Sequence, residues 1–323
     1  MIKWLLSTIP TSSIDGYSVL FSPFSPNLLG FVGGSNYGIS GKGGLIIIEH
    51  GPTGYKEIRR YGWKDVLYNV TWSEIDESVV VVASGDGNIV IFNITQDVPV
   101  AVMSGHLGEV SSVEWSLLRR EQHLISSSWD KTIKLWDPAT GTCLNTLSGH
   151  TGIVYSTNWS PHIPNTVASV SGDGTLRLWD VSQSLNTGTV NDGGNEVLSC
   201  SWNKYEQNLL CSAGTDNTIK LWDIRQFTVP LLIMTGHSQS VRQIKFDPHT
   251  PSYLASCSYD FTVRLWDTAN PLHPLIQTIS HHNEFTYSVD FSVHQKGLIA
   301  DCSWDKTIKL YTPSFVTPPP PIS

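Results

Sequence analysis

Short runs in which apolar and polar residues alternate recur along the chain, and tight turns separate them. The clearest example lies between residues 126 and 137, where Asp130 and Lys131 form a turn and Ile133 and Leu135 then alternate with polar residues. Period-two alternation beside a tight turn predicts two adjacent antiparallel strands. This strand–turn–strand unit is repeated along most of the chain.

The turn aspartates mark the repeats at a nearly constant period. The intervals between them are 44, 43, 43, 44 and 45 residues, and four of the units close with Leu-Trp-Asp. A period in this range, together with the closing Trp-Asp, is typical of WD40 β-propellers. The six turn residues are Asp86, Asp130, Asp173, Asp216, Asp260 and Asp305.

A further unit at the start of the chain lacks the turn aspartate and the tryptophan but keeps the register. Its third strand ends near Ile48, and 44 residues separate Ile48 from Phe92, as they separate Phe92 from Trp136. Counting third strands in this way gives seven units, and no stretch shows a helical period. We therefore expect an all-β fold, a seven-bladed WD40 β-propeller.

Each unit is expected to contain four antiparallel strands. The seventh unit runs from Tyr311 into a proline-rich stretch that cannot donate to a strand ladder. The apolar run from Trp4 to Ser7 belongs to no unit, so we expect the ring to be closed by this N-terminal strand. The domain prediction is a propeller over residues 1–312 and a Pro-rich C-terminal tail over 313–323. Outer strands of the other units are expected near 55–61, 98–103, 143–147, 187–191, 231–234 and 275–279.

The charge balance and the cysteine content of the chain indicate which kinds of partner and which cellular environment suit it. The chain has 323 residues, 20 Lys+Arg against 28 Asp+Glu, and a formal net charge of −8. This balance argues against nucleic acid as the main partner and favours a basic ligand. The five cysteines form no CxxC pair, which predicts buried free thiols in a reducing compartment. We find no apolar run that would span a bilayer.

A histidine lies about 23 residues before several of the turn aspartates, in Gly-His or His-His pairs. In WD40 families this histidine forms a buried hydrogen-bond network with a strand serine, the turn aspartate and the closing tryptophan, and these residues resemble that network. Trp63 and Gly193 occupy the histidine position in two further blades, whose networks we expect to be incomplete. The expected sets are His106, Ser128, Asp130 and Trp136; His150, Ser171, Asp173 and Trp179; His237, Ser258, Asp260 and Trp266; and His282, Ser303, Asp305 and Tyr311.

Paired His and Asp residues also occur in metal centres and catalytic sites, but their repetition in several blades favours a structural role. The sequence contains no Gly-x-Ser-x-Gly elbow, no HExxH motif and no phosphate loop. We therefore expect no enzyme activity, no metal and no cofactor. Function is expected to lie in binding by the loops that a rigid ring presents.

Register selects the candidate binding residues on the face that carries the turn aspartates. Carboxylates and large aromatic side chains on one rim suit a peptide with a cationic residue and apolar anchors. Loop carboxylates are often merely solvated, and aromatic residues before a turn often only pack against the next blade. Both alternatives stay open for each candidate. The candidates are Asp65, Glu109, Glu196 and Glu284 after the histidine position, Tyr68, Tyr155, Arg242 and Tyr287 at the start of the inner strands, and Trp129, Tyr259 and Trp304 before the turn aspartates.

The stretches between the repeat motifs are more specific than the motifs. They resemble the WD40 peroxin family, the cytosolic receptors for the type 2 peroxisomal targeting signal, over most of the chain from about Tyr17 to Tyr311. The stretches that carry the resemblance are 22–24, 36–39, 67–73, 155–164, 255–264, 281–285 and 300–305.

The resemblance implies a receptor that binds the N-terminal amphipathic helix of matrix enzymes such as thiolase, with an essential arginine and spaced apolar residues. It also implies a co-receptor peroxin, docking at peroxin-13 and peroxin-14, contact with the membrane only through these docking proteins, and cycling between the cytoplasm and the peroxisome. Asp65 and Glu109 match the acidic residues near the signal arginine best. The helix's apolar side is then expected on Trp129, Tyr259 or Trp304.

Two other classes of function compete with this hypothesis. A different WD40 adaptor, such as a substrate receptor of a ubiquitin ligase or a histone-tail binder, would also use an acidic face. An enzyme is disfavoured because no catalytic constellation is found. Ligand choice separates the two receptor hypotheses, since one binds a signal helix and the other a histone tail.

Overall fold

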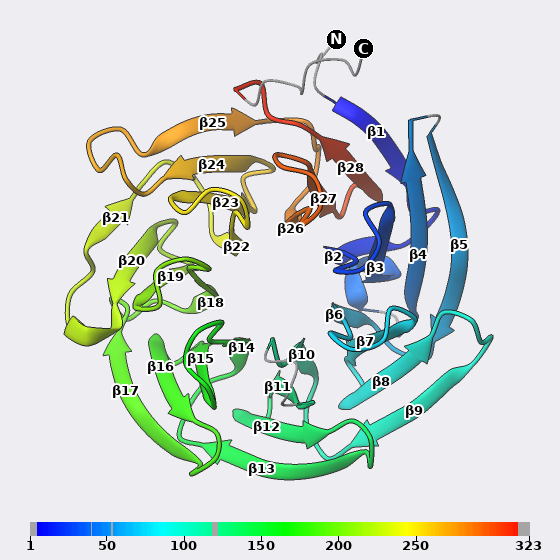
Figure 1. Cartoon of the computed structure of the whole chain (residues 1–323), viewed down its shortest axis with the longest axis horizontal. Coiled ribbons are helices and arrows are strands. Elements are labelled where there is room, and N and C mark those ends of the chain that lie inside the picture. Colours follow the sequence, from blue (N-terminus) through cyan, green and yellow to red (C-terminus); the bar gives the residue numbers. More distant parts are fainter. Residues whose placement is uncertain (1–4, 40, 53, 118–121, 316–323) are drawn as a thin grey trace.

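A computed structural model describes residues 5–39, 41–52, 54–117 and 122–315. Within these ranges the chain forms seven four-stranded antiparallel sheets, arranged as blades around a central opening (Figure 1). The prediction of an all-β, seven-bladed propeller is confirmed. The helical segments found there are two 3₁₀ turns, η1 (Asn36–Gly38) and η2 (Ile224–Gln226). No helix in the described ranges is long and apolar enough to cross a membrane.

The strands follow one another from the central opening outward in each blade. Blade 1 contains β2 (Asp15–Phe21), β3 (Leu28–Gly34), β4 (Gly43–Gly51) and β5 (Gly54–Trp63). Blade 2 contains β6 (Leu67–Trp72), β7 (Val79–Ser84), β8 (Asn88–Asn93) and β9 (Pro99–Ser104). Blade 3 contains β10 (Val110–Trp115), β11 (Leu124–Ser128), β12 (Thr132–Asp137) and β13 (Thr142–Ser148).

The remaining complete blades repeat this plan. Blade 4 contains β14 (Val154–Trp159), β15 (Thr166–Ser171), β16 (Thr175–Asp180) and β17 (Leu185–Asn191). Blade 5 contains β18 (Val197–Trp202), β19 (Leu209–Gly214), β20 (Ile219–Asp223) and β21 (Leu232–Met234). Blade 6 contains β22 (Val241–Phe246), β23 (Tyr253–Ser258), β24 (Val263–Asp267) and β25 (Leu275–Ile279). All six predicted outer strands are present.

Blade 7 is assembled from the two ends of the chain. Its three C-terminal strands are β26 (Thr286–Phe291), β27 (Ile299–Ser303) and β28 (Thr307–Tyr311), and its outer strand is β1 (Leu5–Pro10), antiparallel to β28. The predicted closure by the N-terminal strand is therefore confirmed, although Trp4, part of the predicted run, lies outside the described residues. Closure leaves no gap between first and last blades.

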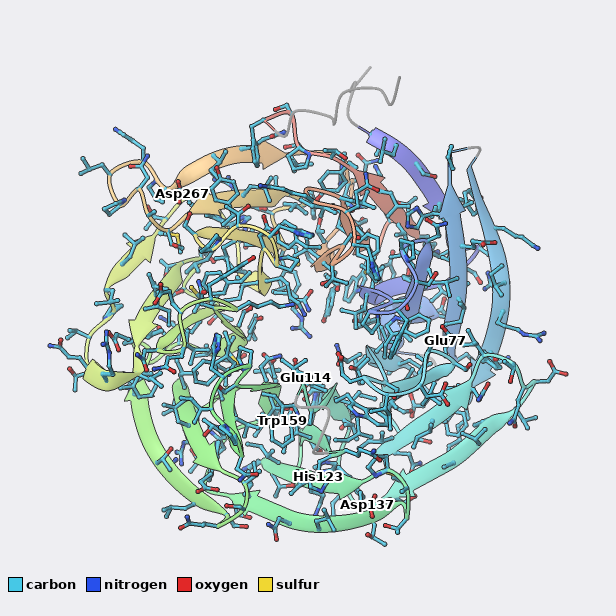
Figure 2. All side chains as sticks on the ribbon, viewed as in Figure 1. Glu77, Glu114, His123, Asp137, Trp159 and Asp267 are labelled. Atoms are coloured by element: carbon cyan, nitrogen blue, oxygen red, sulfur yellow. The ribbon has the colours of Figure 1, made fainter. Side chains whose placement is uncertain are left out.

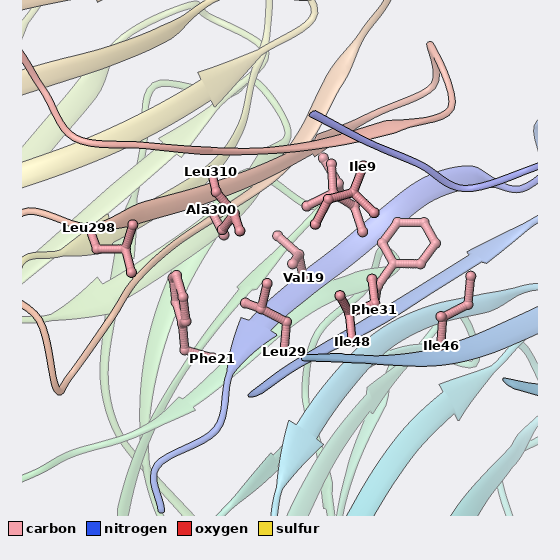
Figure 3. Close-up of a cluster of buried hydrophobic side chains, with 12 residues drawn as sticks. Ile9, Val19, Phe21, Leu29, Phe31, Ile46, Ile48, Leu298, Ala300 and Leu310 are labelled. Atoms are coloured by element: carbon pink, nitrogen blue, oxygen red, sulfur yellow. The ribbon is translucent and has the colours of Figure 1, made fainter. Parts of the chain in front are cut away.

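The core between blades 7 and 1 shows what β1 contributes. Ile9 of β1 is 2% exposed and belongs to one buried cluster with Val19 and Phe31 of blade 1 and with Leu310 of β28 (Figure 3). Burying such a side chain contributes about 1.5–3 kcal/mol. β1 thus completes a sheet and also supplies part of the contact between neighbouring blades.

The tight turns have a common chemistry. In blade 3 the Asp130 carboxylate accepts a hydrogen bond from the backbone N–H of Thr132 at 2.9 Å, which is an Asx-type turn. The residue after each turn aspartate has a positive φ, which glycine adopts freely at Gly87 and Gly174 but which is unusual for Phe261, at φ 69°. The turns therefore form through the aspartate side chain even where glycine is absent.

The glycine-rich stretch, the cysteines and the tail complete the description of the fold. The glycine-rich stretch 30–44 includes the end of β3 and the start of β4, and residue 40 within it lies outside the described ranges. The four cysteines on inner and middle strands are buried, Cys143 is exposed, and all five are free thiols. In the tail, Ser314 donates to the Gln277 side chain, and residues 316–323 lie outside the described ranges.

Candidate functional site

Antiparallel pairing places two kinds of loop on the same face of the ring. These are the loops from the outer strand of one blade to the inner strand of the next, and the turns between the second and third strands. We call this the Asp-turn face. The contact between His106, in the β9–β10 loop, and Asp130, in the β11–β12 turn, links the two kinds of loop directly: Nδ1 lies 2.8 Å from Oδ2.

In blade 3 the network runs through Ser126. The Nε2 atom of His106 lies 2.8 Å from the Ser126 hydroxyl, which also accepts a hydrogen bond from the Trp136 indole at 2.8 Å. The prediction of Ser128 is wrong. Trp136 pairs with Leu124, so its indole reaches the residue two positions along on the same face of the sheet. Ser128 instead donates to the Gly108 carbonyl.

The same two-residue displacement occurs in blades 4 and 6, where Ser169 and Ser256 replace the predicted Ser171 and Ser258. The His150–Asp173 and His237–Asp260 contacts are 2.9 and 2.8 Å. Burial lowers the pKa of His150 and His237. These histidines therefore favour the neutral form.

The aspartate in this network is strongly biased toward its charged form. Burial acts to raise the pKa of Asp173, but hydrogen bonds from Thr175, Thr151 and His150 outweigh it and lower the pKa to about 2. The aspartate is therefore a charged acceptor that holds the two loops together at neutral pH.

Blade 7 replaces the network serine by an aspartate. Asp301 lies 2.9 Å from Nε2 of His282 and 2.7 Å from Nε2 of His281, while Asp305 lies 2.7 Å from Nδ1 of His282. The predicted Ser303 instead donates to the Glu284 carbonyl. Each of these His–carboxylate contacts is of hydrogen-bond length, which favours a structural network over a metal centre, although His281, His282 and Asp301 offer three possible ligand atoms close together.

Two blades lack the histidine. The expectation of an incomplete network is confirmed in blade 2, where Val82 and Phe92 occupy the serine and tryptophan positions, and is wrong in blade 5, where the Trp222 indole donates to Ser212. In blade 2 the Trp63 indole donates to the Asp86 carboxylate at 3.2 Å. In blade 5 Asp192, not Gly193, takes the place of the histidine in the network. It accepts a hydrogen bond from Ser212 and forms an ion pair with Lys220. Lys220 also pairs with Asp216 at 2.6 Å, so a lysine joins two carboxylates in this blade.

The four candidate carboxylates all lie in inter-blade loops of the Asp-turn face. Asp65, Glu109 and Glu284 are half-buried, while Glu196 is exposed. Burial, followed by the electrostatic effects of Glu109, Tyr287 and Asp65 in that order, raises the pKa of Tyr68. Asp65 and Glu109 thus share one neighbourhood around Tyr68. The Glu196 carboxylate accepts a hydrogen bond from Tyr155 at 3.0 Å.

A β-bulge in every inner strand directs one side chain toward the mouth of the central opening. In β6, for example, Leu67 pairs with Ser84 and Asn69 with Ala83, so Tyr68 between them is the extra residue. Bulges commonly redirect side chains next to binding sites. We call the seven bulge residues the mouth ring: Tyr17, Tyr68, Ser111, Tyr155, Leu198, Arg242 and Tyr287.

Aromatic residues form a continuous surface around one side of the mouth ring. The rings of Tyr287 and Trp304 stack at 5.3 Å between centroids, and Tyr17 lies 4.6 Å from Tyr287 and 5.3 Å from Tyr68. Trp129 is 40% exposed and stacks on Tyr68 at 6.4 Å. Tyr259 and Trp304 are half-buried among these rings, whereas Trp129 presents much of its surface outward.

Two cavities lie along the central axis. The upper one, about 160 Å³, is lined by six mouth-ring residues together with Trp129, Glu196, Thr215 and Tyr259. The lower one, about 130 Å³, is lined by the inner strands and contains Glu114, which lies beside the central opening next to Trp159 in Figure 2. Glu284 and Trp304 do not line the upper cavity.

Several apolar residues of this face were not predicted from the sequence. Tyr37 is 49% exposed and Leu107 is 95% exposed, and both lie in its loops. Leu107 follows the network histidine, at the position where other blades have Thr151, Ser238 and Asn283. An apolar residue at a position that is otherwise polar was the available signal. Tyr17 was missed because the bulge that directs it inward has no signature in the alternation pattern.

Comparisons with known proteins agree with this architecture. A family model described as “WD domain, G-beta repeat” matches residues 97–137 and 273–312, and one described as “EIPR1 beta-propeller” matches residues 139–266. The chain is 54% identical over 280 residues to the peroxisomal targeting signal 2 receptor of Mus musculus, covering 86% of this chain and 88% of the relative.

Two further relatives extend the similarity. The peroxisomal targeting signal 2 receptor of Homo sapiens is 54% identical over 277 residues, covering 85% of each chain. The peroxisome biogenesis protein 7 of Arabidopsis thaliana is 45% identical over 280 residues, covering 85% of this chain and 88% of the relative. The similarity therefore extends over most of the propeller and is not confined to the repeat motif.

Proposed function

Since the chain belongs to the family of peroxisomal targeting signal 2 receptors, we propose that its Asp-turn face binds the N-terminal type 2 signal helix of peroxisomal matrix proteins. The observation that carries this proposal is the combination of Asp65 and Glu109 around Tyr68 with the adjoining aromatic surface. A basic amphipathic helix presents the complementary charge and apolar stripe.

The helix arginine is placed against Asp65 and Glu109. Both carboxylates are half-buried, so an ion pair formed there is shielded from water better than a pair on an open surface. Glu196 and Glu284 stand farther round the same face and add long-range attraction for a cation.

The apolar stripe of the helix is placed on Trp129 first. Its indole is 40% exposed, whereas Tyr259 and Trp304 are half-buried and present less surface. Leu107, which is 95% exposed in the neighbouring inter-blade loop, extends the apolar surface beyond the residues that the sequence predicted. Tyr68, Tyr155 and Tyr287 form the floor between these anchors.

The remaining parts of the proposal follow from a binding role. The protein delivers cargo such as thiolase together with a co-receptor peroxin, which covers the outer side of the helix, and docks at peroxin-13 and peroxin-14. It acts in the cytoplasm, cycles to the peroxisome, and performs no catalysis. Residues 1–312 form the receptor domain and 313–323 a tail.

Ligand choice tests the proposal against the competing adaptor. Fluorescence anisotropy with a labelled thiolase signal helix and with a histone-tail peptide of equal net charge compares the two ligands on the full-length chain. The proposal expects saturable binding of the signal helix and much weaker binding of the histone peptide. Equal binding of both peptides, or preference for the histone tail, contradicts it. A pull-down from cytosol with and without the co-receptor then identifies the cargo by mass spectrometry.

A further inference from the structure

The mouth ring contains one charged residue, Arg242, among four tyrosines, a serine and a leucine. Its guanidinium carbon lies 4.6 Å from the centre of the Tyr287 ring, a cation–π distance. Arg242 is the cation among the residues that line the upper cavity, whose other charged group is the Glu196 carboxylate. A cation at the centre of an acidic rim does not serve the binding of a cationic helix residue, so it requires another explanation.

No carboxylate among the described residues lies within ion-pair distance of Arg242. The ion pairs found among the described residues, at 4.0 Å or less, do not include it, whereas Arg177 and Arg264 both approach the turn aspartates of their own blades. A half-buried guanidinium has lost part of its hydration, and an unpaired charge in such a place is costly. The upper cavity leaves room for an anion to approach the Arg242 guanidinium.

The other groups around the cavity are suited to an acceptor. Burial, then the charge of Glu196, raises the pKa of Tyr155 to about 12, and burial also raises the pKa of Tyr68. Both phenols therefore remain protonated at neutral pH. The Tyr155 hydroxyl already donates to Glu196, a carboxylate that also lines the cavity, so the Tyr68 hydroxyl is the one left to donate to a ligand. The Tyr259 hydroxyl donates to Tyr287 at 3.4 Å, at the edge of the same cavity. Guanidinium and phenol donors converging on a small cavity suit a planar, bidentate oxyanion.

We propose that the upper cavity is a carboxylate subsite, in which Arg242 and the surrounding tyrosine hydroxyls receive an Asp or Glu side chain of the bound peptide. Together with the peripheral carboxylates it gives the face a charge pattern with a positive centre and a negative rim. A helix with a cation at one end and an acid farther along fits this pattern in one direction only. Arg242 thereby becomes a determinant of cargo specificity and of helix orientation. The inference rests on the proposed cargo site and adds a second polar contact to it.

The test is a scan of the labelled thiolase signal helix, with Glu or Gln placed in turn at each position that is neither the arginine nor an apolar anchor. Affinities are measured by anisotropy on the full-length wild-type chain and on the variants Arg242→Gln, Arg242→Lys and Arg225→Gln. Arg225 pairs with Asp223 at the opposite face and serves as the matched control. Thermal unfolding of every variant checks that the fold is intact.

At one or two positions, Glu is expected to bind on the order of ten-fold more tightly than Gln to the wild-type chain. Arg242→Gln abolishes this ratio, Arg242→Lys retains part of it because lysine lacks the bidentate fork, and Arg225→Gln leaves it unchanged. A ratio near one at every position, or a ratio that survives in Arg242→Gln, overturns the carboxylate subsite while leaving the cargo site itself standing.

A second arm does not depend on cargo. If the parent helix fails to bind, the cargo proposal fails, and the subsite is tested with glutarate alone by the side-chain Nε–H resonance of Arg242, assigned with Arg242→Lys. A saturable shift with glutarate, absent with its neutral diamide, supports the subsite. No shift up to high glutarate concentration overturns it.

Discussion

Ile9 of β1 lies directly opposite Ile308 of β28, so the first and last described strands of the chain pair with each other. The Ile9 side chain is 2% exposed and packs into the core shared by blades 7 and 1. Ile9→Ala is therefore expected to lower the free energy of unfolding by about 2–5 kcal/mol, through lost burial and the cavity left behind. Urea denaturation followed by tryptophan fluorescence measures this loss.

Leu6 provides the matched control for this prediction. It lies on the same strand but is 62% exposed, so Leu6→Ala is expected to change the stability by less than about 0.5 kcal/mol. Equal effects of the two substitutions would show that β1 adds no burial to the ring and that closure depends on something else.

The buried serine hydroxyl of blade 3 gives a second prediction. Ser126→Ala leaves Nε2 of His106 and the Trp136 indole without their shared partner, at an expected cost of about 1–3 kcal/mol. Ser104→Ala, which removes an exposed hydroxyl that contacts Asn88, is expected to cost less than about 0.5 kcal/mol. Chemical denaturation of both variants measures these losses of stability. An unchanged denaturation midpoint for Ser126→Ala would contradict the prediction.

Blade 7 is expected to respond to pH in the opposite sense from blades 4 and 6. Burial alone would lower the pKa of His282, but Asp301 and Asp305 outweigh it and raise the pKa. A histidine with a raised folded-state pKa stabilises the fold fully below its unfolded value of about 6.5, and this stability is lost as the pH rises through the folded value. His150 and His237 have lowered pKa values, so their protonation costs stability as the pH falls below about 6.5.

Asp301→Ser, which restores the serine found in blades 3, 4 and 6, separates these contributions. The substitution is expected to destabilise the protein more at about pH 6 than at about pH 8, because the charged His282 loses its partner only where it is charged. Urea denaturation at both pH values gives the free energies of unfolding of the wild type and the variant. The titration of the other blades cancels in the difference between the two proteins. A destabilisation that is the same at both pH values, or larger at the higher one, would exclude a charged His282.

The exposed indole on the Asp-turn face gives a prediction about binding. Trp129→Ala is expected to weaken the signal helix on the order of ten-fold, as removal of a central aromatic anchor commonly does. Its thermal unfolding is expected to stay close to that of the wild type, because the ring is 40% exposed. Tyr205→Ala removes a comparably exposed ring, 48%, from the opposite face and should leave the affinity unchanged. If both variants bind alike, Trp129 is not an anchor.

The repeat architecture was predictable because it depends on local sequence patterns. The intervals between the turn aspartates, together with the 44-residue interval from Ile48 to Phe92, predicted the number of blades, and the prolines after Tyr311 indicated β1 as the missing strand. The repeats depend on the alternation within strands, and the closure depends on the backbone N–H that proline lacks. Both properties can be recognised in the sequence itself.

The site was less predictable, because it depends on contacts between strands. Choosing Ser128 in place of Ser126 assumed that the network serine is the one nearest the turn, whereas the pairing of Trp136 with Leu124 decides it. The partner of Asp86 was unforeseen because an indole can take the donor role of an imidazole. Tyr68, Tyr155 and Tyr287 of the mouth ring were selected by register, but the ring as a whole was unforeseen because a bulge shifts one residue without altering the alternation around it.

The central claim is that a cationic helix is held by the carboxylates beside Tyr68. Its most direct test is the affinity of the thiolase signal helix for the double variant Asp65→Lys/Glu109→Lys, with Glu77→Lys, in the loop between β6 and β7 on the opposite face, as control. We expect the double variant to lose affinity by about 100-fold or more while its unfolding midpoint is unchanged, and Glu77→Lys to bind like the wild type. Wild-type affinity in the folded double variant would contradict the claim.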